Sequence, residues 1–159
     1  MSNRLLTLVR HAHADWPPGE PIGADDLRPI TPYGQETLSQ LLPRLVDEGL
    51  LPDVVLHSPL VRSEQTAQQV AEGLGIAERV VREPKLRPGF DEKALADLLI
   101  AYGQARWVML VAHNPDLTNV QYALTRKHVI FSPATVATVE LTRERPSLRG
   151  VLRWVLRAE

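Results

Sequence analysis

The chain has 159 residues, enough for one core of ordinary size, so we expect residues 1–159 to form a single domain. Its 18 basic and 19 acidic side chains nearly balance, which gives no overall field favouring nucleic acid or an anionic membrane as a partner. There is no cysteine, which excludes disulfides, thiolate metal ligands and cysteine nucleophiles. The sequence shows neither a signal peptide nor an apolar run of about 20 residues, so we expect a cytoplasmic protein.

A short strand and a long loop come first in the chain. Residues 5–9 are apolar and predict a buried strand that ends at Arg10 and His11. Residues 15–31 hold four prolines and two glycines. They predict a loop that is long for so small a domain, and such loops are often functional.

A helix is predicted to follow this loop. Thr31 and Pro32 form a typical helix start, with a hydroxyl cap and then proline at the first helical position. Pro43 lies inside the helical pattern, where it removes a hydrogen bond, so we expect a kink there. One apolar face is formed by Leu38, Leu41, Leu42 and Leu45.

The second strand and second helix are joined by a motif rich in polar residues. Residues 52–58 predict a strand, and Ser58 with Pro59 predicts the start of a helix that Gly75 ends. The apolar face of this helix is formed by Ala67, Val70, Ala71 and Leu74.

The rest of the chain continues to alternate between strand and helix. We expect strands at 79–82 and 106–112, helices at 92–101 and from a cap at Asn114 to about Thr125, and two last strands at 135–142 and 151–157. The last two strands alternate in polarity, which indicates an antiparallel edge. The pattern as a whole predicts an α/β fold, a three-layer α/β/α sandwich with a mostly parallel sheet and an antiparallel edge.

Three of the predicted strands end on a polar pair of residues. These pairs are Arg10–His11, His57–Ser58 and His113–Asn114. Ligands of open α/β sheets bind beyond the carboxyl ends of the strands, so we expect a ligand site where the three pairs meet.

The first of these strand ends allows a metal hypothesis. His11, His13 and Asp15 have the spacing of metal ligands, and imidazole and carboxylate suit zinc. Trp16 stands where a longer metallohydrolase motif would have another histidine, and the chain is far shorter than the roughly 250 residues of a barrel. Arg10 would also repel a dication, so we expect no metal.

An anion hypothesis uses more of the chain. Arg62 lies in the first turn of the predicted second helix, where the helix dipole disfavours a cation and favours an anion. A phosphate would explain this position, because backbone N–H groups and a guanidinium can bind the same oxygens. Together with Arg10, His11 and His113, Arg62 would form a cationic pocket at one sheet edge.

These residues lie in motifs that resemble the histidine phosphatase superfamily, also called phosphoglycerate mutase-like. The motifs are LVRHA at 8–12, SPLVRSEQT at 58–66 and VAHNPDL at 111–117. Two further segments, DDLRPITPYGQE at 25–36 and FSPATVATVEL at 131–141, resemble the small SixA-type phosphohistidine phosphatase branch. The resemblance runs in order from about residue 5 to residue 141.

The resemblance implies a phosphoglycerate mutase-like fold, no cofactor, and a site for a phosphoryl group rather than for a metal. It implies that His11 is the nucleophile and that Arg10, Arg62 and His113 surround the phosphoryl group, with Asn114 beside it. His13, Asp15 and Ser58 then become positions at the rim of the site or behind it.

The implied chemistry needs a neutral His11 and a protonated His113, which predicts a bell-shaped pH dependence. The general acid stays unknown. Glu83, Asp91 and Glu92 lie in the region where larger relatives carry a carboxylate, but none matches the pattern. A leaving group that departs without strong acid assistance, such as the imidazole of a phosphohistidine, is therefore favoured over an alkoxide.

We therefore expect a metal-independent phosphatase that acts on phosphohistidine in a protein, such as a component of a phosphorelay or phosphotransferase system, and that releases inorganic phosphate. Two alternatives stay open. One is a phosphatase for a small phosphorylated metabolite, and the other is a phosphate-binding module without turnover. We expect neither nucleic acid nor a membrane as a partner.

Overall fold

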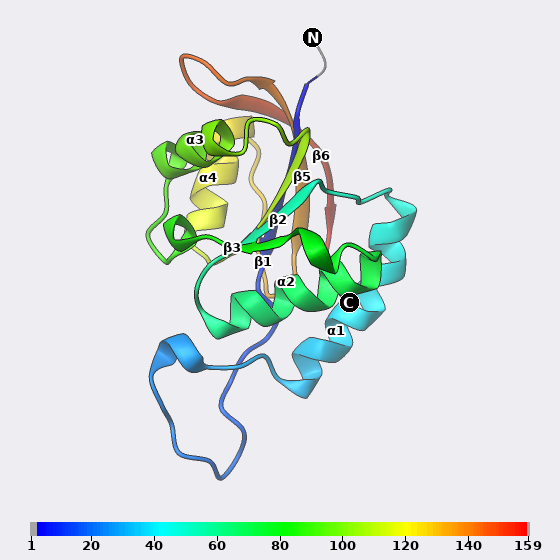
Figure 1. Cartoon of the computed structure of the whole chain (residues 1–159), viewed down its shortest axis with the longest axis vertical. Coiled ribbons are helices and arrows are strands. Elements are labelled where there is room, and N and C mark those ends of the chain that lie inside the picture. The colour runs from blue at the N-terminus through cyan, green and yellow to red at the C-terminus, as the bar shows by residue number, and fades with distance from the viewer. Residues whose placement is uncertain (1–2, 159) are drawn as a thin grey trace.

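The computed structural model describes residues 3–158 and contains one six-stranded sheet (Figure 1). The strands are β1 (Leu5–Arg10), β2 (Val54–His57), β3 (Val80–Arg82), β4 (Trp107–Ala112), β5 (Val136–Arg143) and β6 (Arg149–Leu156). Their order across the sheet is β3-β2-β4-β1-β5-β6. The first four in this order are parallel, while β5 is antiparallel to both β1 and β6. The prediction of a mostly parallel sheet with an antiparallel edge is confirmed.

Four α-helices cover the two faces of the sheet (Figure 1). They are α1 (Pro32–Asp47), α2 (Val61–Leu74), α3 (Glu92–Ala101) and α4 (Asp116–Thr125). Three short 3-10 turns lie between the larger elements, at Asp25–Leu27, Ala77–Arg79 and Pro84–Leu86. The helices α3 and α4 pack on one face of the sheet and α1 and α2 on the other, which confirms the predicted three layers.

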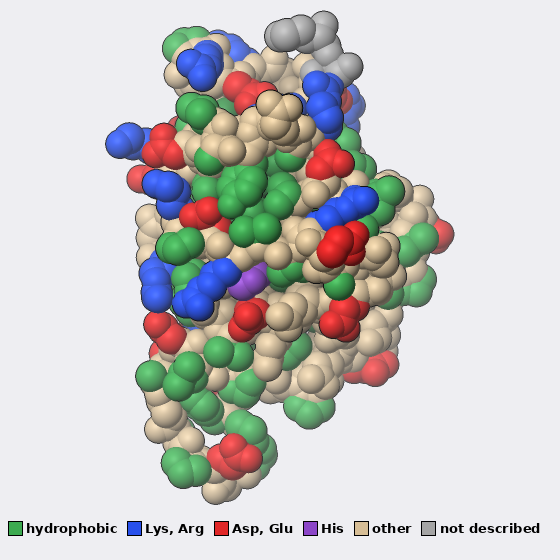
Figure 2. Space-filling model, in the orientation of Figure 1, with side chains coloured by type: hydrophobic (Ala, Val, Ile, Leu, Met, Phe, Trp, Pro, Cys, Tyr) green, Lys and Arg blue, Asp and Glu red, His purple; other side chains and the backbone are tan. Residues whose placement is uncertain are grey.

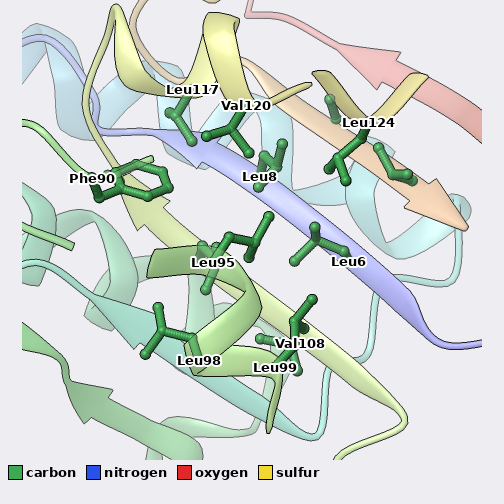
Figure 3. Close-up of a cluster of buried hydrophobic side chains, with 14 of the residues drawn as sticks. Leu6, Leu8, Phe90, Leu95, Leu98, Leu99, Val108, Leu117, Val120 and Leu124 are labelled. Atoms are coloured by element: carbon green, nitrogen blue, oxygen red, sulfur yellow. The ribbon is translucent and has the colours of Figure 1, made fainter. Parts of the chain in front are cut away.

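Each face of the sheet has its own hydrophobic core. Figure 3 shows the core under α3 and α4, where leucines of both helices point toward Leu6 and Leu8 of β1 and Val108 of β4. The opposite face of the same strands packs Val9 and Val111 against α1 and α2. A strand buried on both faces reads as an unbroken apolar run, which is why β1 and β4 were visible in the sequence.

The helix α1 begins as predicted. The hydroxyl of Thr31 accepts a hydrogen bond from the backbone N–H of Gly34 at 3.0 Å, and Pro32 is the first helical residue. The helix continues through Pro43 to Asp47 without interruption. A side chain at position 34 would not fit, because an added Cβ would lie 2.4 Å from the carbonyl oxygen of His13. Gly34 therefore lets α1 pack directly against the chain that leaves β1.

The predicted cap of α2 was wrong. This helix begins at Val61 with Leu60 in the cap position and no side-chain cap, instead of starting after Ser58. The hydroxyl of Ser58 is engaged by the imidazole of His113 at 2.6 Å and accepts only a long bond from the N–H of Leu60. Gly75 ends the helix as predicted, in the left-handed conformation with a φ of 75°.

The start of α4 differs by one residue from the prediction. Pro115 occupies the cap position, but the side chain of Asn114 still accepts hydrogen bonds from the N–H and the hydroxyl of Thr118. Asn114 thus satisfies an open N–H of the first helical turn, as expected of a capping residue.

The surface carries charges of both signs, and Figure 2 shows acidic and basic side chains intermixed on one face. Among residues 3–158, no helix has both the length and the apolar character that crossing a bilayer requires.

Candidate active site

The carboxyl ends of β1 and β4 meet at one open cleft with a volume of about 470 Å³, whereas the third predicted pair, His57–Ser58 at the end of β2, does not line it. The cleft is lined by Arg10, His11, Arg62, His113 and Asn114, among others. These residues are separated by more than a hundred positions in the sequence, and three elements bring them together: the end of β1, the first turn of α2 and the end of β4. The structure therefore brings together the cationic group that the sequence predicted.

His11 is buried and held in one orientation. Its ring nitrogen Nδ1 lies 2.8 Å from the carbonyl oxygen of Ala12. A carbonyl oxygen accepts and cannot donate, so Nδ1 carries the proton and Nε2 keeps its lone pair. Burial, with a contribution from the nearby cations of Arg62 and Arg10, lowers the pKa of His11 to about 4. The imidazole is therefore neutral and nucleophilic near pH 7.

Two arginines lie beside it, each with part of its guanidinium engaged. Arg10 donates from Nη1 to the carbonyl oxygen of Phe131 at 2.8 Å. Arg62 donates to the backbone oxygen of Asp25 at 3.0 Å and to its carboxylate at 3.2 Å. In both arginines the Nε atom is buried and has no hydrogen-bond partner among residues 3–158. Burial lowers the pKa of both groups, but guanidinium stays charged near neutral pH.

His113 faces His11, with the ring centroids 5.4 Å apart. Its Nε2 lies 2.6 Å from the hydroxyl oxygen of Ser58 and 3.3 Å from that of Ser63, while its Nδ1 is buried without a partner. Burial, and then the charges of His11 and Arg62, lower the pKa of His113 to about 3. His113 is therefore neutral near pH 7 in the ligand-free protein, because a third buried cation beside the two arginines is disfavoured. The protonated His113 expected from the sequence concerns the complex with a phosphoryl group and stays a prediction.

Three buried nitrogens of the cleft residues thus lack an acceptor within the part of the chain that the structure describes: Nε of Arg10, Nε of Arg62 and Nδ1 of His113. Buried polar groups without partners are rare in native structures and call for an explanation. Two guanidinium groups and an imidazole beside a nucleophilic nitrogen suit a tetrahedral oxyanion, whose oxygens can accept from all three.

The motif residues after Arg62 hold this arrangement together. Thr66 accepts from the backbone N–H of Ala12 at 3.0 Å and donates to the carbonyl oxygen of Arg62 at 2.8 Å. Gln65 accepts from the backbone N–H of Ile30 at 2.9 Å. One turn of α2 therefore fixes both the chain after His11 and the end of the long loop.

Two charged residues of the cleft were not assigned any role from the sequence. Asp25 and Arg28 lie on the loop of residues 15–31 and line the cleft. The carboxylate of Asp25 pairs with Arg62 at 3.2 Å and with Arg28 at 3.1 Å. Burial acts to raise the pKa of Asp25, but the two cations outweigh it and lower the pKa. The segment that contains both residues was recognised by resemblance, yet spacing alone gave no reason to place a carboxylate against Arg62.

The remaining candidates lie around this centre. His13 is exposed at the rim, and its Nδ1 lies 2.8 Å from the hydroxyl of Thr31. Asp15 is exposed and accepts from the N–H of Trp16. Ser58 is fully buried behind His113 rather than at the rim. Within the described part of the chain, no three His, Asp or Glu side chains are arranged to hold a metal ion, so the spacing of His11, His13 and Asp15 does not become a ligand set.

None of the three carboxylates considered as a general acid lines the cleft. Glu83 accepts from the hydroxyl of Tyr102, and Asp91 caps α3 by accepting from the N–H of Ala94. One carboxylate oxygen of Glu92 is buried without a partner in the first turn of α3. Asn114 lines the cleft, but its side chain is engaged with Phe131 and Thr118.

Comparison with known protein families matches residues 6–98, more than half of the chain, to the model of the histidine phosphatase superfamily (branch 1). The matched segment contains Arg10, His11 and Arg62 but ends before His113, so His113 joins the site through the geometry described above. A comparison with curated protein sequences finds no match.

Solved structures with the same fold include phosphatases of two kinds. The protein histidine phosphatase SixA in complex with tungstate is 23% identical, with a TM-score of 0.82 and 97% of each chain covered. A putative phosphohistidine phosphatase SixA from Agrobacterium tumefaciens is 22% identical, with a TM-score of 0.76 over 97% of this chain and 98% of the other. A mycobacterial glucosyl-3-phosphoglycerate phosphatase is 18% identical, with a TM-score of 0.70 over 98% and 99%. At these identities the likeness establishes the fold.

Proposed function

Because the chain belongs to the histidine phosphatase superfamily and is a phosphatase, we propose that it works through a covalent phosphohistidine on His11 and that its substrate is a phosphohistidine of another protein. The observation that supports the covalent step is the arrangement of nitrogen atoms in the cleft. A neutral imidazole with a free Nε2 lone pair lies beside three buried nitrogens that lack acceptors.

In the first step Nε2 of His11 attacks phosphorus, and the bond from phosphorus to the leaving nitrogen breaks with its electron pair on that nitrogen. A leaving imidazole that already holds a proton on its other nitrogen departs neutral. Negative charge on the phosphoryl oxygens is stabilised by Arg10, Arg62 and His113. The hydrogen bond from Nδ1 of His11 to the carbonyl of Ala12 stabilises the positive charge that develops on the ring.

In the second step water attacks phosphorus, the bond from phosphorus to Nε2 breaks, and its electron pair returns to the imidazole. His11 is regenerated in its neutral form with the proton on Nδ1, and dihydrogen phosphate leaves and loses a proton to solvent according to pH. The same three donors hold the oxygens in both steps, so no rearrangement of the site is needed.

Two features support a phosphohistidine substrate. The cleft is open, so a side chain of a second protein can enter it. Its carboxylate, Asp25, is paired with two arginines that lower its pKa, so it is ionised near neutral pH and poorly suited to protonate an alkoxide. An imidazole needs less assistance from an acid than an alkoxide does when it leaves.

A phosphatase for a small phosphate ester is the second candidate, because the mycobacterial glucosyl-3-phosphoglycerate phosphatase shares this fold. A third candidate is a module that binds phosphate without turnover. The nucleophile, both arginines and the second histidine are all present in the cleft, which disfavours this third candidate.

A phosphoenzyme trap tests the mechanism. Wild-type protein and His11→Ala are incubated with radiolabelled phosphoramidate, quenched with alkali and separated on a gel. We expect label that is stable in alkali and lost in acid on the wild type and none on His11→Ala. Label on both proteins, or on neither while phosphate is bound, would contradict a covalent step on His11.

A substrate panel tests the second part of the proposal. Phosphate release is measured from a histidine-phosphorylated phosphorelay or phosphotransferase protein and from a series of sugar phosphates. We expect kcat/KM to be highest for the phosphoprotein. A higher value for a sugar phosphate would favour the metabolite phosphatase instead.

A further inference from the structure

The hydrogen bonds around Ser58 determine which nitrogen of His113 carries a proton. Ser58 is fully buried at the end of β2, and its hydroxyl oxygen accepts from the backbone N–H of Leu60 at 3.3 Å. The same oxygen lies 2.6 Å from Nε2 of His113. A hydroxyl has one hydrogen to donate, and among the described residues Nε2 is the acceptor within its reach.

The alternative tautomer satisfies fewer groups. If Nε2 of His113 carried the proton, it would donate to the oxygen of Ser58, which already accepts from Leu60, and the hydroxyl hydrogen of Ser58 would be buried without an acceptor. Leaving a buried donor without a partner is unfavourable, because the group loses its hydrogen bonds to water and gains none in the protein. With Nε2 as the acceptor, the hydroxyl is satisfied and the proton of the neutral ring stands on Nδ1.

Nδ1 is the atom of His113 that is buried and has no partner in the described part of the chain. A proton on Nδ1 makes this nitrogen a hydrogen-bond donor even when the ring is neutral. The groups that face His113 are cationic or neutral on most sides, with Arg10 and His11 from the end of β1 and Arg62 from α2, and Asp25 of the loop is the facing carboxylate. A further positive charge is unfavourable in this surrounding until an anion binds.

We propose that Ser58 is a positioning residue that fixes His113 as a neutral donor, so that Nδ1–H binds a phosphoryl oxygen without His113 becoming a cation. The inference rests on the proposed function, because the acceptor for Nδ1–H is the phosphoryl group of the substrate. In this proposal the positive charge of the site comes from Arg10 and Arg62. His113 contributes a hydrogen bond from Nδ1 that orients the phosphoryl group.

A second serine, Ser63, also lies near His113 but makes a weaker contact with it. Its hydroxyl lies 3.3 Å from Nε2, so Ser63 makes a longer contact than Ser58. One lone pair of Nε2 accepts one strong hydrogen bond, and the shorter contact takes it. We therefore expect Ser63→Ala to change the state of His113 less than Ser58→Ala does.

The tautomer is measured directly by nitrogen NMR of protein labelled at its five histidines. Spectra are recorded near pH 7.5, with and without inorganic phosphate, and the signals of His113 are identified by their loss in His113→Gln. We expect a protonated Nδ1 and an unprotonated Nε2 in both spectra. Two protonated nitrogens in the phosphate complex, or a neutral ring with its proton on Nε2, would overturn the proposal.

Kinetics of Ser58→Ala give an independent readout. Without the hydroxyl, the neutral ring of His113 can place its proton on Nε2. We expect about a tenfold loss of kcat/KM near pH 7.5 and, in the nitrogen spectrum of the same variant, a neutral His113 with its proton on Nε2. The same loss of kcat/KM in a variant that keeps the proton on Nδ1 would indicate a purely structural role and would contradict the proposal.

Two variants serve as controls. Ser58→Thr keeps the hydroxyl and should restore the activity and the Nδ1-protonated ring of the wild type, while Ser39→Ala, on the exposed face of α1, should leave both activity and spectra unchanged. The phosphoenzyme trap separates this inference from the proposed function. Label on His11 together with a doubly protonated His113 would leave the proposed function intact and reject the role of Ser58.

Discussion

The rings of His11 and His113 face each other with centroids 5.4 Å apart, and burial together with the neighbouring arginines keeps both of them neutral near pH 7. Each ring has one nitrogen fixed by the protein, Nδ1 of His11 by Ala12 and Nε2 of His113 by Ser58. In the proposed mechanism the other nitrogens interact with the substrate, Nε2 of His11 as the nucleophile and Nδ1 of His113 as a hydrogen-bond donor. Both rings are neutral in this mechanism.

The pH dependence of kcat/KM follows from this state. Because kcat/KM reports the free enzyme, its acid limb should lie near pH 4, where His11 gains a proton and loses its lone pair. No basic limb from His113 is expected up to about pH 8, because this ring is already neutral. The measurement is a pH profile corrected for the ionisation of the substrate. A bell shape with a limb near pH 6.5 in the wild type would show that a cationic His113 is required.

Arg62 should matter for turnover more than for folding. We expect Arg62→Ala to lower kcat/KM by about 100-fold or more, because it removes a donor to the phosphoryl oxygens. Its melting temperature should stay within a few degrees of the wild type, since the change deletes a cation rather than core volume. Arg82→Ala, an exposed position on β3, is the control and should keep full activity. A loss of activity that is equal in both variants would contradict this role.

Asp25 should weaken the binding of free phosphate. Its carboxylate shares Arg62 and Arg28 with the incoming anion, so Asp25→Asn should lower the inhibition constant of inorganic phosphate by about threefold. The effect is small because the Asp25 side chain is 65% exposed and its charge is screened by solvent.

The neighbouring residue offers a matched control for Asp25. Asp26 lies on the same loop and pairs with Arg87 at 3.2 Å instead of with the arginines of the cleft. Asp26→Asn should leave the inhibition constant unchanged. If phosphate instead bound more weakly to Asp25→Asn than to Asp26→Asn, Asp25 would hold Arg62 in position rather than compete with phosphate for it.

Gly34→Ala should destabilise the fold. The added methyl group would lie 2.4 Å from the carbonyl oxygen of His13, a backbone atom that cannot move away without shifting α1 or the chain after β1. Overpacking of this kind costs about 1–3 kcal/mol, which urea denaturation would measure. Glu36→Ala, exposed on the same helix, is the control. Equal stability of the two variants would contradict the close packing at Gly34.

Acid should destabilise the protein through the same two histidines. Their pKa values are lowered from 6.5 to about 4 for His11 and about 3 for His113 in the folded state, so the unfolded chain binds protons that the folded protein does not. Stability is therefore complete above pH 6.5 and is lost as the pH falls toward 4, by about 1.4 kcal/mol per pH unit for each histidine.

Chemical denaturation between about pH 4.5 and pH 6 would measure this slope. We expect the free energy of unfolding of His113→Gln to depend less on pH than that of the wild type. The difference should be the contribution of one histidine, about 1.4 kcal/mol per pH unit. An unchanged slope in this variant would show that His113 is not buried in its neutral form.

Much of this fold was predictable, because strands buried on both faces leave apolar runs and because the polar ends of β1, β2 and β4 could be placed at one edge. The predicted start of α2 was wrong because the hydroxyl of Ser58 can either cap a helix or bind His113. The sequence does not show which of these hydrogen bonds forms. The neutral state of His113 in the ligand-free protein could not be predicted from the sequence. It results from burial by segments that are far apart in the chain.

The loop of residues 15–31 shows the other limit. Its composition predicted an irregular segment, but the pairing of Asp25 with Arg62 depends on where the loop folds back. No periodic pattern marks such a contact. Charged residues on an irregular loop can be assigned to a site only when the three-dimensional path of the loop is known.

A crystal structure of this protein with tungstate tests the central claim most directly. We expect the tungsten atom beside Nε2 of His11, with the tungstate oxygens accepting from Nε of Arg10, Nε of Arg62 and Nδ1 of His113. An anion bound elsewhere in the cleft, or one that leaves these three nitrogens without partners, would contradict it.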